Sequence, residues 1–350
     1  MRKYLYLQLF FATITAREIP MAKPIDELST RKEAYRQRQK NSRHRGQSLA
    51  VNKPRRLQPG ARIGIVAPAG CVGEEALHLG IAAIKAEGFE VEVAAHVYDQ
   101  KGYLAGDEKR RALELKNFFQ RSDIDGIFCA RGGFGSIQLL SHLNRDLSQY
   151  PKIFVGYSDI TILINWFRQH CGMVTFHAPM VAMDLAKGLS LRSREHFWEI
   201  LTGARRNWTV NLGEVIRPGR VQAEMTGGCL SLLITTLGTP YEIDTRGKML
   251  FLEDVGEKPY RIERMLIHLR MAGKFDGLAG IVFGDFTNCT DGGSRDIRQV
   301  IGELFLAADF PVVMGLTAGH GAENLALPFG VPMSLDSGDC SLSLDESPVS

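Results

Sequence analysis

The chain has 350 residues, of which 45% are hydrophobic and 23% charged, a composition that excludes collagen-like, disulfide-scaffold and wholly disordered proteins. No apolar run approaches the ~20 residues that a membrane-spanning helix needs, and the length predicts two domains at about 100–200 residues each. The net charge of +3 is unevenly spread: residues 1–56 hold 14 Lys and Arg against 4 Asp and Glu, whereas the remainder holds 28 against 35. The body is therefore mildly acidic, and we expect it to bind no nucleic acid and to form no stable association with a membrane.

Residues 1–56 are predicted to form a basic leader that is disordered or partly helical. Its apolar stretch Tyr4–Ala16 has the beginnings of a secretory signal, but polar residues interrupt it, and Met21 offers a second start. The basic run that follows has Tyr35 as its one aromatic residue, so the stacking of a single-strand binder is missing. We expect a solvated tail rather than an RNA-binding arm, and a cytoplasmic protein, with export to the periplasm as the alternative.

Strand and helix patterns alternate from about residue 57 to residue 205. The apolar run Ile63–Ala67 ends at a Pro-Ala-Gly loop and predicts a buried strand. The helical stretch Ala76–Glu87 then ends at Gly88. The same alternation continues with strands at 89–95, 126–130 and 152–156 and helices at 107–120, 135–143 and 159–170. This order predicts an α/β domain with a mostly parallel sheet and helices on both faces.

The pattern is interrupted by Arg, Asn and Pro residues over 206–222, which we interpret as a linker. A second α/β domain is predicted over 223–350. Its expected elements are a helix after Gly227-Gly228, strands at 248–252, 280–283 and 311–314, and helices at 261–272 and 297–307.

The segment Gly156-Tyr157-Ser158-Asp159 joins an apolar strand directly to a helix. A serine on such a tight turn projects its hydroxyl above the sheet, close to the first free N–H groups of the helix. Those groups can stabilise negative charge that develops on a substrate oxygen. Asp159 is placed to cap the helix through its carboxylate, so a capping pair without a catalytic role is the alternative.

A serine nucleophile needs a base and a group that orients the base. Among nine histidines, His320 has glycines on both sides, which let the backbone bend sharply and leave the imidazole accessible. Glu253 closes an apolar strand and is the nearest candidate for the orienting acid, with Asp254 and Glu257 as competitors. A structural turn histidine and a solvated acidic loop are the alternatives.

The glycine-rich run Arg131-Gly132-Gly133-Phe134-Gly135 follows a predicted strand. It lacks the last glycine of a dinucleotide-binding motif and the lysine of a P-loop, so we expect no nucleotide cofactor. Such a turn can instead offer backbone N–H groups to an oxyanion. The alternative is a tight turn that packs against another part of the backbone.

The six cysteines are scattered, with no CxxC pair, as expected for reduced thiols of a cytosolic protein. The sequence contains no HExxH motif, EF-hand loop or Cys/His cluster, so it implies no metal.

Together these residues resemble the serine LD-carboxypeptidase family, also called muramoyltetrapeptide carboxypeptidases, from about residue 62 to about residue 330. Seven motifs follow one another in the family's order: GIVAPAG at 64–70, YLAG at 103–106, RGGFG at 131–135, GYSD at 156–159, LEDVGEKPYRIER at 252–264, FGDFTNC at 283–289 and GHGAEN at 319–324.

The resemblance implies a flavodoxin-like N-terminal domain over 57–205 and a smaller α/β C-terminal domain over 223–350, with the active site in the cleft between them. It implies that Ser158 is the nucleophile, His320 the general base and Glu253 the residue that orients the base. The oxyanion donors would be the backbone N–H of Asp159 and that of Gly132 or Gly133.

The resemblance also implies the reaction. Family members are metal-independent serine peptidases without a cofactor, and they hydrolyse the amide between meso-diaminopimelate and the terminal D-alanine of muropeptide tetrapeptides. This reaction belongs to peptidoglycan recycling in the cytoplasm. The expected partner is a small peptide or muropeptide substrate, and family analogy suggests a homodimer.

Two positions depart from the family's pattern and can alter the shape of the cleft. Cys229 stands where the family has the Asn of a GGN motif, and Ala178 stands where it has the Gly of HGP. Two other functions stay open: a hydrolase that resembles the microcin-immunity branch and cleaves aminoacyl nucleotides, and a non-catalytic peptide-binding protein. The third residue of the stem peptide, the role of the leader and the reactivity of Cys229 are not decided by the sequence.

Overall fold

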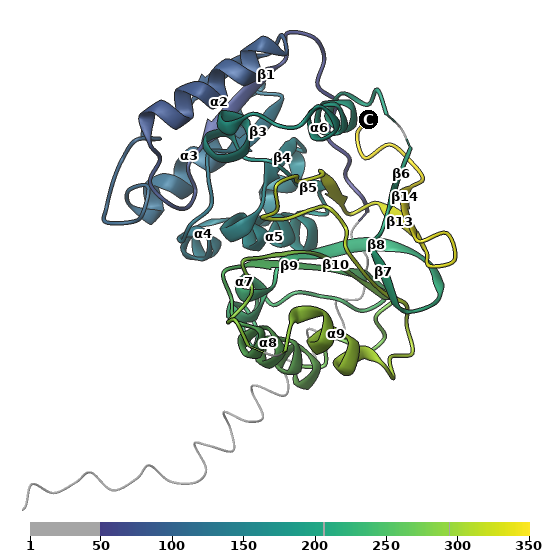
Figure 1. Cartoon of the computed structure of the whole chain (residues 1–350). Helices are drawn as coiled ribbons and strands as arrows, with labels where there is room; N and C mark the ends of the chain where they lie inside the picture. Colours follow the sequence, from purple (N-terminus) through teal and green to yellow (C-terminus); the bar gives the residue numbers. More distant parts are fainter. Residues whose placement is uncertain (1–49, 206, 294) are drawn as a thin grey trace, which may run out of the picture. The chain divides into compact units, whose positions relative to one another are not determined.

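A computed structural model describes residues 50–205, 207–293 and 295–350 (Figure 1). The signal-like stretch and most of the predicted basic leader lie outside the described residues. No helix in the described ranges is both long and apolar enough to cross a membrane.

Five strands from residues 62–177 and one strand from near the end of the chain form a six-stranded sheet in the order β12-β5-β4-β3-β1-β2. Five of its strands are parallel, and their order β2-β1-β3-β4-β5 is that of flavodoxin-like folds. This confirms the predicted fold class. The strands are β1 (Arg62–Val66), β2 (Glu90–Val93), β3 (Gly126–Cys129), β4 (Ile153–Gly156), β5 (Thr175–His177) and the antiparallel β12 (Leu327–Phe329).

Helices cover both faces of this sheet, as the alternation predicted (Figure 1). They are α2 (Glu74–Ala86), α3 (Glu108–Gln120), α4 (Ser136–Leu139), α5 (Thr161–Cys171) and α6 (Leu191–Thr202), with 3-10 turns at Leu140–His142 and Arg145–Gln149. The start of α3 is confirmed in detail, because the side chain of Asp107 accepts a hydrogen bond from the Lys109 N–H.

Aromatic side chains fix which helix packs on which face. Phe154 of β4 contacts Phe119 of α3 and Phe167 of α5, with ring centroids 6.0 and 4.8 Å away. Phe128 of the neighbouring strand β3 pairs with Val155, the residue after Phe154. Its side chain therefore points to the other face, where its ring centroid lies 5.7 Å from that of Phe197 in α6. Because successive side chains of a strand alternate between faces, this pattern places α3 and α5 opposite α6.

The second half of the chain forms an eight-stranded sheet in the order β6-β14-β13-β8-β9-β10-β11-β7. Its centre, β8 to β11, is parallel, and the outer strands are antiparallel. The strands are β6 (Trp208–Asn211), β7 (Glu214–Arg217), β8 (Arg220–Cys229), β9 (Met249–Val255), β10 (Gly280–Thr287), β11 (Val312–Met314), β13 (Pro332–Asp336) and β14 (Ser341–Leu344).

Three helices cover one face of the second sheet: α7 (Leu230–Thr235), α8 (Pro259–Met271) and α9 (Ile297–Phe305). Leu250 and Leu252 of β9 belong to the same buried cluster as Ile262 of α8 and Ile301 of α9. The residue between the two leucines, Phe251, points to the opposite face and packs on the first half of the chain: its ring lies 5.0 Å from that of His177.

The segment 206–222, interpreted as a linker, instead contains β6, β7 and the first residues of β8. β6 and β7 are only four residues long, and Gly213 and the Pro218-Gly219 pair follow them. These short strands with turn residues between them made the sequence of the segment look irregular. The chain also crosses back later, since β12 lies beside β5 in the first sheet. The two sheets therefore share one continuous core, and the predicted domain boundaries do not separate them cleanly.

Candidate active site

Ser158 lies on the tight turn that the sequence predicted, between β4 and α5. The strand is fully buried and ends at Gly156, where a Cβ would lie 2.7 Å from the side chain of Ile160. Ser158 itself has φ 61°, a left-handed backbone conformation that a residue with a side chain adopts only when its surroundings impose it. A 3-10 turn over Ser158–Ile160 then leads into α5. The side chain of Ser158 is half-buried, so it is within reach of a ligand.

The prediction that Asp159 caps the following helix is wrong. The 3-10 turn delays the start of α5 to Thr161, and the N-cap of that helix, Ile160, makes no side-chain capping bond. The fully buried Asp159 instead accepts a hydrogen bond of 2.8 Å from the backbone N–H of Ser136, and Ser136 Oγ donates to the Asp159 carbonyl at 2.5 Å. These two bonds join the serine turn to the glycine-rich turn.

The glycine-rich turn after β3 lies directly against Ser158. A Cβ at Gly132 would lie 2.8 Å from Ser158 Oγ and 3.3 Å from the backbone nitrogen of Asp159, so only glycine fits there. Gly133, with φ 107°, lies against Gly70 in the loop after β1. The structure thus gathers the predicted oxyanion residues at the carboxyl ends of β1, β3 and β4, where doubly wound sheets bind ligands. Which of the two glycines donates stays a prediction.

A buried cation holds the glycine-rich turn in place. Arg111 of α3 is 3% exposed, and its Nη1 donates to the carbonyl oxygens of Pro68 and Gly135 at 2.5 and 3.0 Å. Its Nη2 donates to Gln138 Oε1 at 2.6 Å. The guanidinium therefore ties the loop after β1 to the turn after β3. Sequence reasoning missed Arg111, because nothing in a helical run of charged residues marks one of them as buried.

Glu253 is the carboxylate that contacts His320. It lies near the end of β9, is fully buried, and accepts a hydrogen bond of 2.7 Å from His320 Nδ1. The two competing carboxylates are engaged elsewhere: Asp254 accepts bonds from the N–H and hydroxyl of Ser231, and Glu257 pairs with Arg261.

The glycines around His320 make this contact possible. A Cβ at Gly319 would lie 2.6 Å from Glu253 Oε2, so a larger residue would displace the carboxylate. Burial lowers the pKa of His320, but the hydrogen bond and charge of Glu253 outweigh it and raise that pKa above its ordinary value of 6.5. Burial raises the pKa of Glu253, and the bond from His320 opposes this shift.

The imidazole of His320 packs edge-on against the ring of Tyr157, the residue before Ser158, with centroids 4.8 Å apart. The side chain of His320 is 15% exposed. Within the described ranges Ser158 and His320 make no hydrogen bond with each other. The structure thus joins His320 to Glu253 and brings the pair to the serine turn.

Sequence reasoning missed Asp184 and His177, two residues near His320. Tyr157 OH donates a hydrogen bond of 3.1 Å to Asp184 Oδ1. Asp184 lies in a π-helical turn over Val181–Leu185, a kind of turn that is common at functional sites. His177 is fully buried beside the same tyrosine, and burial together with the charge of His320 lowers its pKa to about 3. Its imidazole is therefore neutral. The short HAP motif was the available signal for His177.

Cys229, at the end of β8, is 2% exposed and lies 3.6 Å from Asp254 Oδ1. Burial and the neighbouring carboxylates raise the pKa of its thiol well above the ordinary value of 9.0, which favours the protonated form. All six cysteines are free. No group of His, Cys, Asp and Glu side chains that could hold a metal ion occurs in the part of the chain that the structure describes.

Comparison with known protein families gives two matches along the chain. The model of the LD-carboxypeptidase N-terminal domain matches residues 63–178, and that of the LD-carboxypeptidase C-terminal domain matches residues 222–335. A probable murein peptide carboxypeptidase of Bacillus subtilis is 35% identical over 294 residues, which cover 82% of this chain and 92% of the relative.

Solved structures with a similar fold include a carboxypeptidase and a self-immunity protein. The muramoyltetrapeptide carboxypeptidase of Oxalobacter formigenes superposes with a TM-score of 0.75 at 29% identity, covering 81% of this chain and 97% of that one. A microcin C7 self-immunity protein in complex with aspartyl sulfamoyl adenosine superposes with a TM-score of 0.78 at 25% identity, covering 85% of this chain and 100% of that one.

Proposed function

The chain belongs to the LD-carboxypeptidase family, a family of peptidases, and from that premise we propose that it is a metal-independent serine carboxypeptidase of murein tetrapeptides. The proposed bond is the amide between meso-diaminopimelate and the terminal D-alanine. One observation carries the proposal: the hydrogen bond of 2.7 Å between His320 and the buried Glu253, with the imidazole packed against the residue before Ser158.

The first half of the proposed reaction transfers the peptidyl group to Ser158. His320 Nε2 takes the proton of Ser158 Oγ as that oxygen attacks the carbonyl carbon of the scissile amide. Glu253 keeps the other proton of the imidazole on Nδ1 and stabilises the imidazolium that forms. Backbone N–H groups of Asp159 and of Gly132 or Gly133 receive the negative charge of the carbonyl oxygen.

The second half releases both products. The imidazolium of His320 donates its proton to the nitrogen of D-alanine, the C–N bond breaks, and D-alanine leaves as an amine. A water molecule then attacks the Ser158 ester with His320 again as the base. The tripeptide leaves as a carboxylic acid, and Ser158 recovers its proton.

The test is mass spectrometry of defined muropeptides incubated with the purified full chain. We expect tetrapeptides to lose one D-alanine, at the same rate with and without a chelator. Ser158→Ala should lower the rate of D-alanine release at least about 10³-fold, because it removes the attacking atom.

Ser141→Ala, at an exposed serine on another 3-10 turn, is the matched control and should keep the wild-type rate. Unchanged release of D-alanine by Ser158→Ala would contradict the nucleophile assignment. Loss of activity with the chelator would contradict metal independence.

By analogy with the family to which the chain belongs, we propose that the protein acts in peptidoglycan recycling in the cytoplasm and that it forms a homodimer. Cell fractionation tests the location: recovery of a processed chain from the periplasm would contradict it. Light scattering of the purified chain tests the dimer, and a monomer mass would contradict it.

A second candidate function is hydrolysis of aminoacyl nucleotides with the same triad. The observation in its favour is the likeness to the microcin C7 self-immunity protein that binds aspartyl sulfamoyl adenosine. Comparing hydrolysis of a muramoyl tetrapeptide with that of an aminoacyl sulfamoyl adenosine separates the two. Activity on the nucleotide alone would favour this second candidate over the carboxypeptidase.

A further inference from the structure

Tyr157 connects the turn of the proposed nucleophile with the proposed base. Its backbone leads directly into Ser158, which is held in a left-handed conformation with φ 61°. Its ring lies 4.8 Å from the imidazole of His320, at an interplanar angle of 61°. Since Ser158 and His320 make no hydrogen bond with each other within the described ranges, this ring contact is what brings the imidazole to the serine turn.

The ring of Tyr157 is itself held at its hydroxyl. The residue is 4% exposed, and a buried hydroxyl without a partner would cost stability. The partner is the carboxylate of Asp184, whose Oδ1 accepts the hydrogen bond of the hydroxyl at 3.1 Å. The other oxygen, Oδ2, accepts a hydrogen bond of 2.8 Å from the backbone N–H of Met180. Both oxygens of the carboxylate are therefore engaged, and its direction is fixed.

The π-helical turn that carries Asp184 is anchored to two neighbouring elements. The N–H of Ala182 donates to the carbonyl of Ala130, directly after β3, at 2.8 Å. The turn also packs against α2, where a Cβ at Gly80 would lie 2.1 Å from the carbonyl oxygen of Val181. The first sheet and one of its helices thus fix the position of Asp184.

Asp184 also adds a negative charge close to the base. The titratable groups around His320 and Asp184 are Glu253 and Asp254 of β9, Asp285 of β10, His177 of β5, Tyr157 and the exposed Lys187. Burial lowers the pKa of His320, but the hydrogen bond and charge of Glu253, aided by the charges of the two aspartates Asp254 and Asp184, raise it. Burial raises the pKa of Asp184, and the bond from the Met180 N–H opposes this shift.

We propose that Asp184 is a positioning residue, which acts through Tyr157 on the imidazole of His320. By holding the tyrosine hydroxyl, it keeps the ring in the place against which the imidazole packs, and the base stays within reach of Ser158. This inference rests on the proposed function and adds a second carboxylate to it. Glu253 holds the tautomer of the imidazole through a direct bond, whereas Asp184 holds the position of the imidazole from another element of the fold.

Tyr157→Phe tests the hydrogen bond alone, because it keeps the ring and removes the hydroxyl. We expect kcat for D-alanine release by the purified full chain to fall about 10-fold, the lower end of the range for a hydrogen bond to a charged group, with KM for the tetrapeptide unchanged. Tyr241→Phe is the matched control and should keep the wild-type kcat, because that ring lies beside another histidine, His170, at the far end of α5. An unchanged kcat, or a change in KM alone, would overturn the inference and leave the proposed function intact.

Asp184→Asn removes the charge and one of the two acceptor oxygens. We expect kcat to fall about 10-fold at a pH where the base is neutral. The acid limb of the pH–rate profile should also move to lower pH, because a charge that raises the pKa of His320 is lost. Asp276→Asn, at an exposed turn between α8 and β10, is the matched control and should change neither quantity. A lower midpoint of urea unfolding with the acid limb unmoved would mean a merely structural role and would overturn the inference.

The double variant of Tyr157→Phe and Asp184→Asn tests whether the two residues act as one unit. Its kcat should equal that of the slower single variant, because the second change removes a bond that is already lost. Losses that multiply would overturn the inference. Absence of D-alanine release by the wild-type chain would overturn the proposed function, and the inference with it. Tyr157→Phe keeps the packed ring, so the test does not depend on the folding of Asp184→Asn.

Discussion

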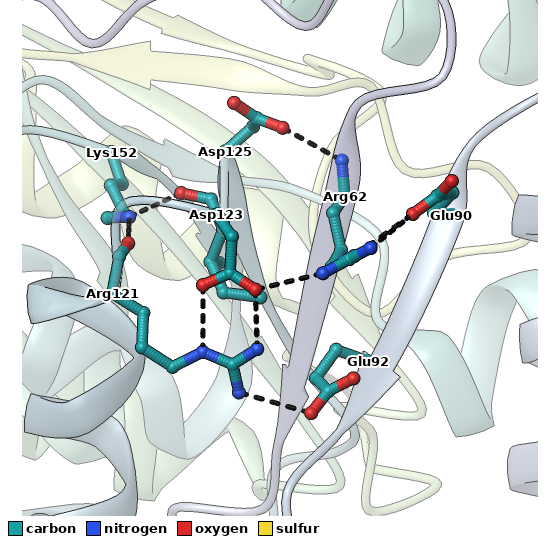
Figure 2. A network of polar contacts seen from close by, with 8 residues as sticks. Arg62, Glu90, Glu92, Arg121, Asp123, Asp125 and Lys152 are labelled. Carbon is teal, nitrogen blue, oxygen red and sulfur yellow. Dashed lines mark hydrogen bonds and ion pairs between the residues drawn. The ribbon is translucent and has the colours of Figure 1, made fainter.

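The two ends of the parallel strands in the first sheet differ in how their charges are arranged. At the amino ends, Arg62 donates to Glu90 and Asp123, and Arg121 donates to Asp123 and Glu92 (Figure 2). The ammonium group of Lys152, just before β4, donates to two backbone carbonyls of the loop before β3. Each of these groups has a partner of opposite charge or polarity, so this end stabilises the positions of the strands.

The carboxyl ends hold polar groups without such partners. Ser158 is in a left-handed conformation, and Oδ1 of Asp159 is buried without a hydrogen-bond partner within the described ranges. The same is true of Oε1 of Glu253, which lies near the carboxyl end of β9 in the second sheet. Strain and unpaired polar groups cost stability, and sites that bind and react are where such features persist. The contrast indicates that one end holds the fold and the other end performs the chemistry.

The largest effect expected from a change at the carboxyl end is that of Glu253→Gln. Without the negative charge, the imidazole loses the group that holds its tautomer, and kcat should fall by about 10⁴-fold. The base acts in its neutral form, so the wild-type rate should rise with pH through a pKa above 6.5. In the variant, the raising effect of Glu253 is lost while burial still lowers the pKa of His320, so the acid limb of the pH–rate profile should move to lower pH.

The pH–rate profile of D-alanine release measures both effects. Glu257→Gln, at a carboxylate that pairs with Arg261 instead, is the matched control and should leave the acid limb unmoved. An acid limb at the same pH in Glu253→Gln would show that Glu253 does not set the pKa of the base.

A smaller loss is expected from Gly132→Ala. The added Cβ would lie 2.8 Å from Ser158 Oγ and would displace either the hydroxyl or the turn. Since the loss of one oxyanion donor typically slows the reaction about 10²- to 10³-fold, kcat should fall by that factor.

Gly73→Ala is the matched control for this change, because its φ is −77° and a Cβ there meets nothing within 4 Å. It should leave kcat unchanged. A Gly132→Ala variant with wild-type kcat would mean that the glycine-rich turn does not touch the reacting atoms.

The smallest effect on activity is expected at the amino ends of the strands, from Asp123→Asn. The change weakens the pairs with Arg121 and Arg62, so the midpoint of urea unfolding should fall while kcat stays at the wild-type value. Those arginines lower the pKa of Asp123, so its contribution is present above the ordinary carboxyl pKa of 3.8 and is lost as pH falls below it. A loss of kcat without a change in unfolding would break the contrast between the two ends.

The sequence predicted those parts of the molecule that depend on local patterns. Apolar runs followed by glycine or proline gave the strands of the first sheet, and the same runs located Ser158 and the glycine-rich turn at strand ends. The role of Asp159 was wrong because a 3-10 turn of three residues shifted the start of the helix. The choice between Glu253 and Asp254 depends on which side of β9 faces His320, and a strand sequence does not specify that side.

Features that depend on pairing between distant strands could not be predicted. The three-residue β12 joins the first sheet only because its partner β5 lies at the edge, and nothing in its sequence identifies that partner. The pairing of β10 with β9 shifts between Phe283 and Phe286, and this irregularity exists only in the register of the two strands, so the sequence does not mark it. Arg111 is buried by a loop and a turn from other parts of the chain.

A crystal structure of the His320→Gln variant with an intact tetrapeptide bound tests directly whether Ser158 attacks the scissile carbonyl at the carboxyl ends of these strands. We expect the carbonyl carbon to lie about 3–3.5 Å from Ser158 Oγ, with its oxygen hydrogen-bonded to the N–H of Asp159 and of Gly132 or Gly133. A peptide bound with that carbon out of reach of Ser158, and another nucleophile or a water molecule beside it, would rule out Ser158 as the nucleophile.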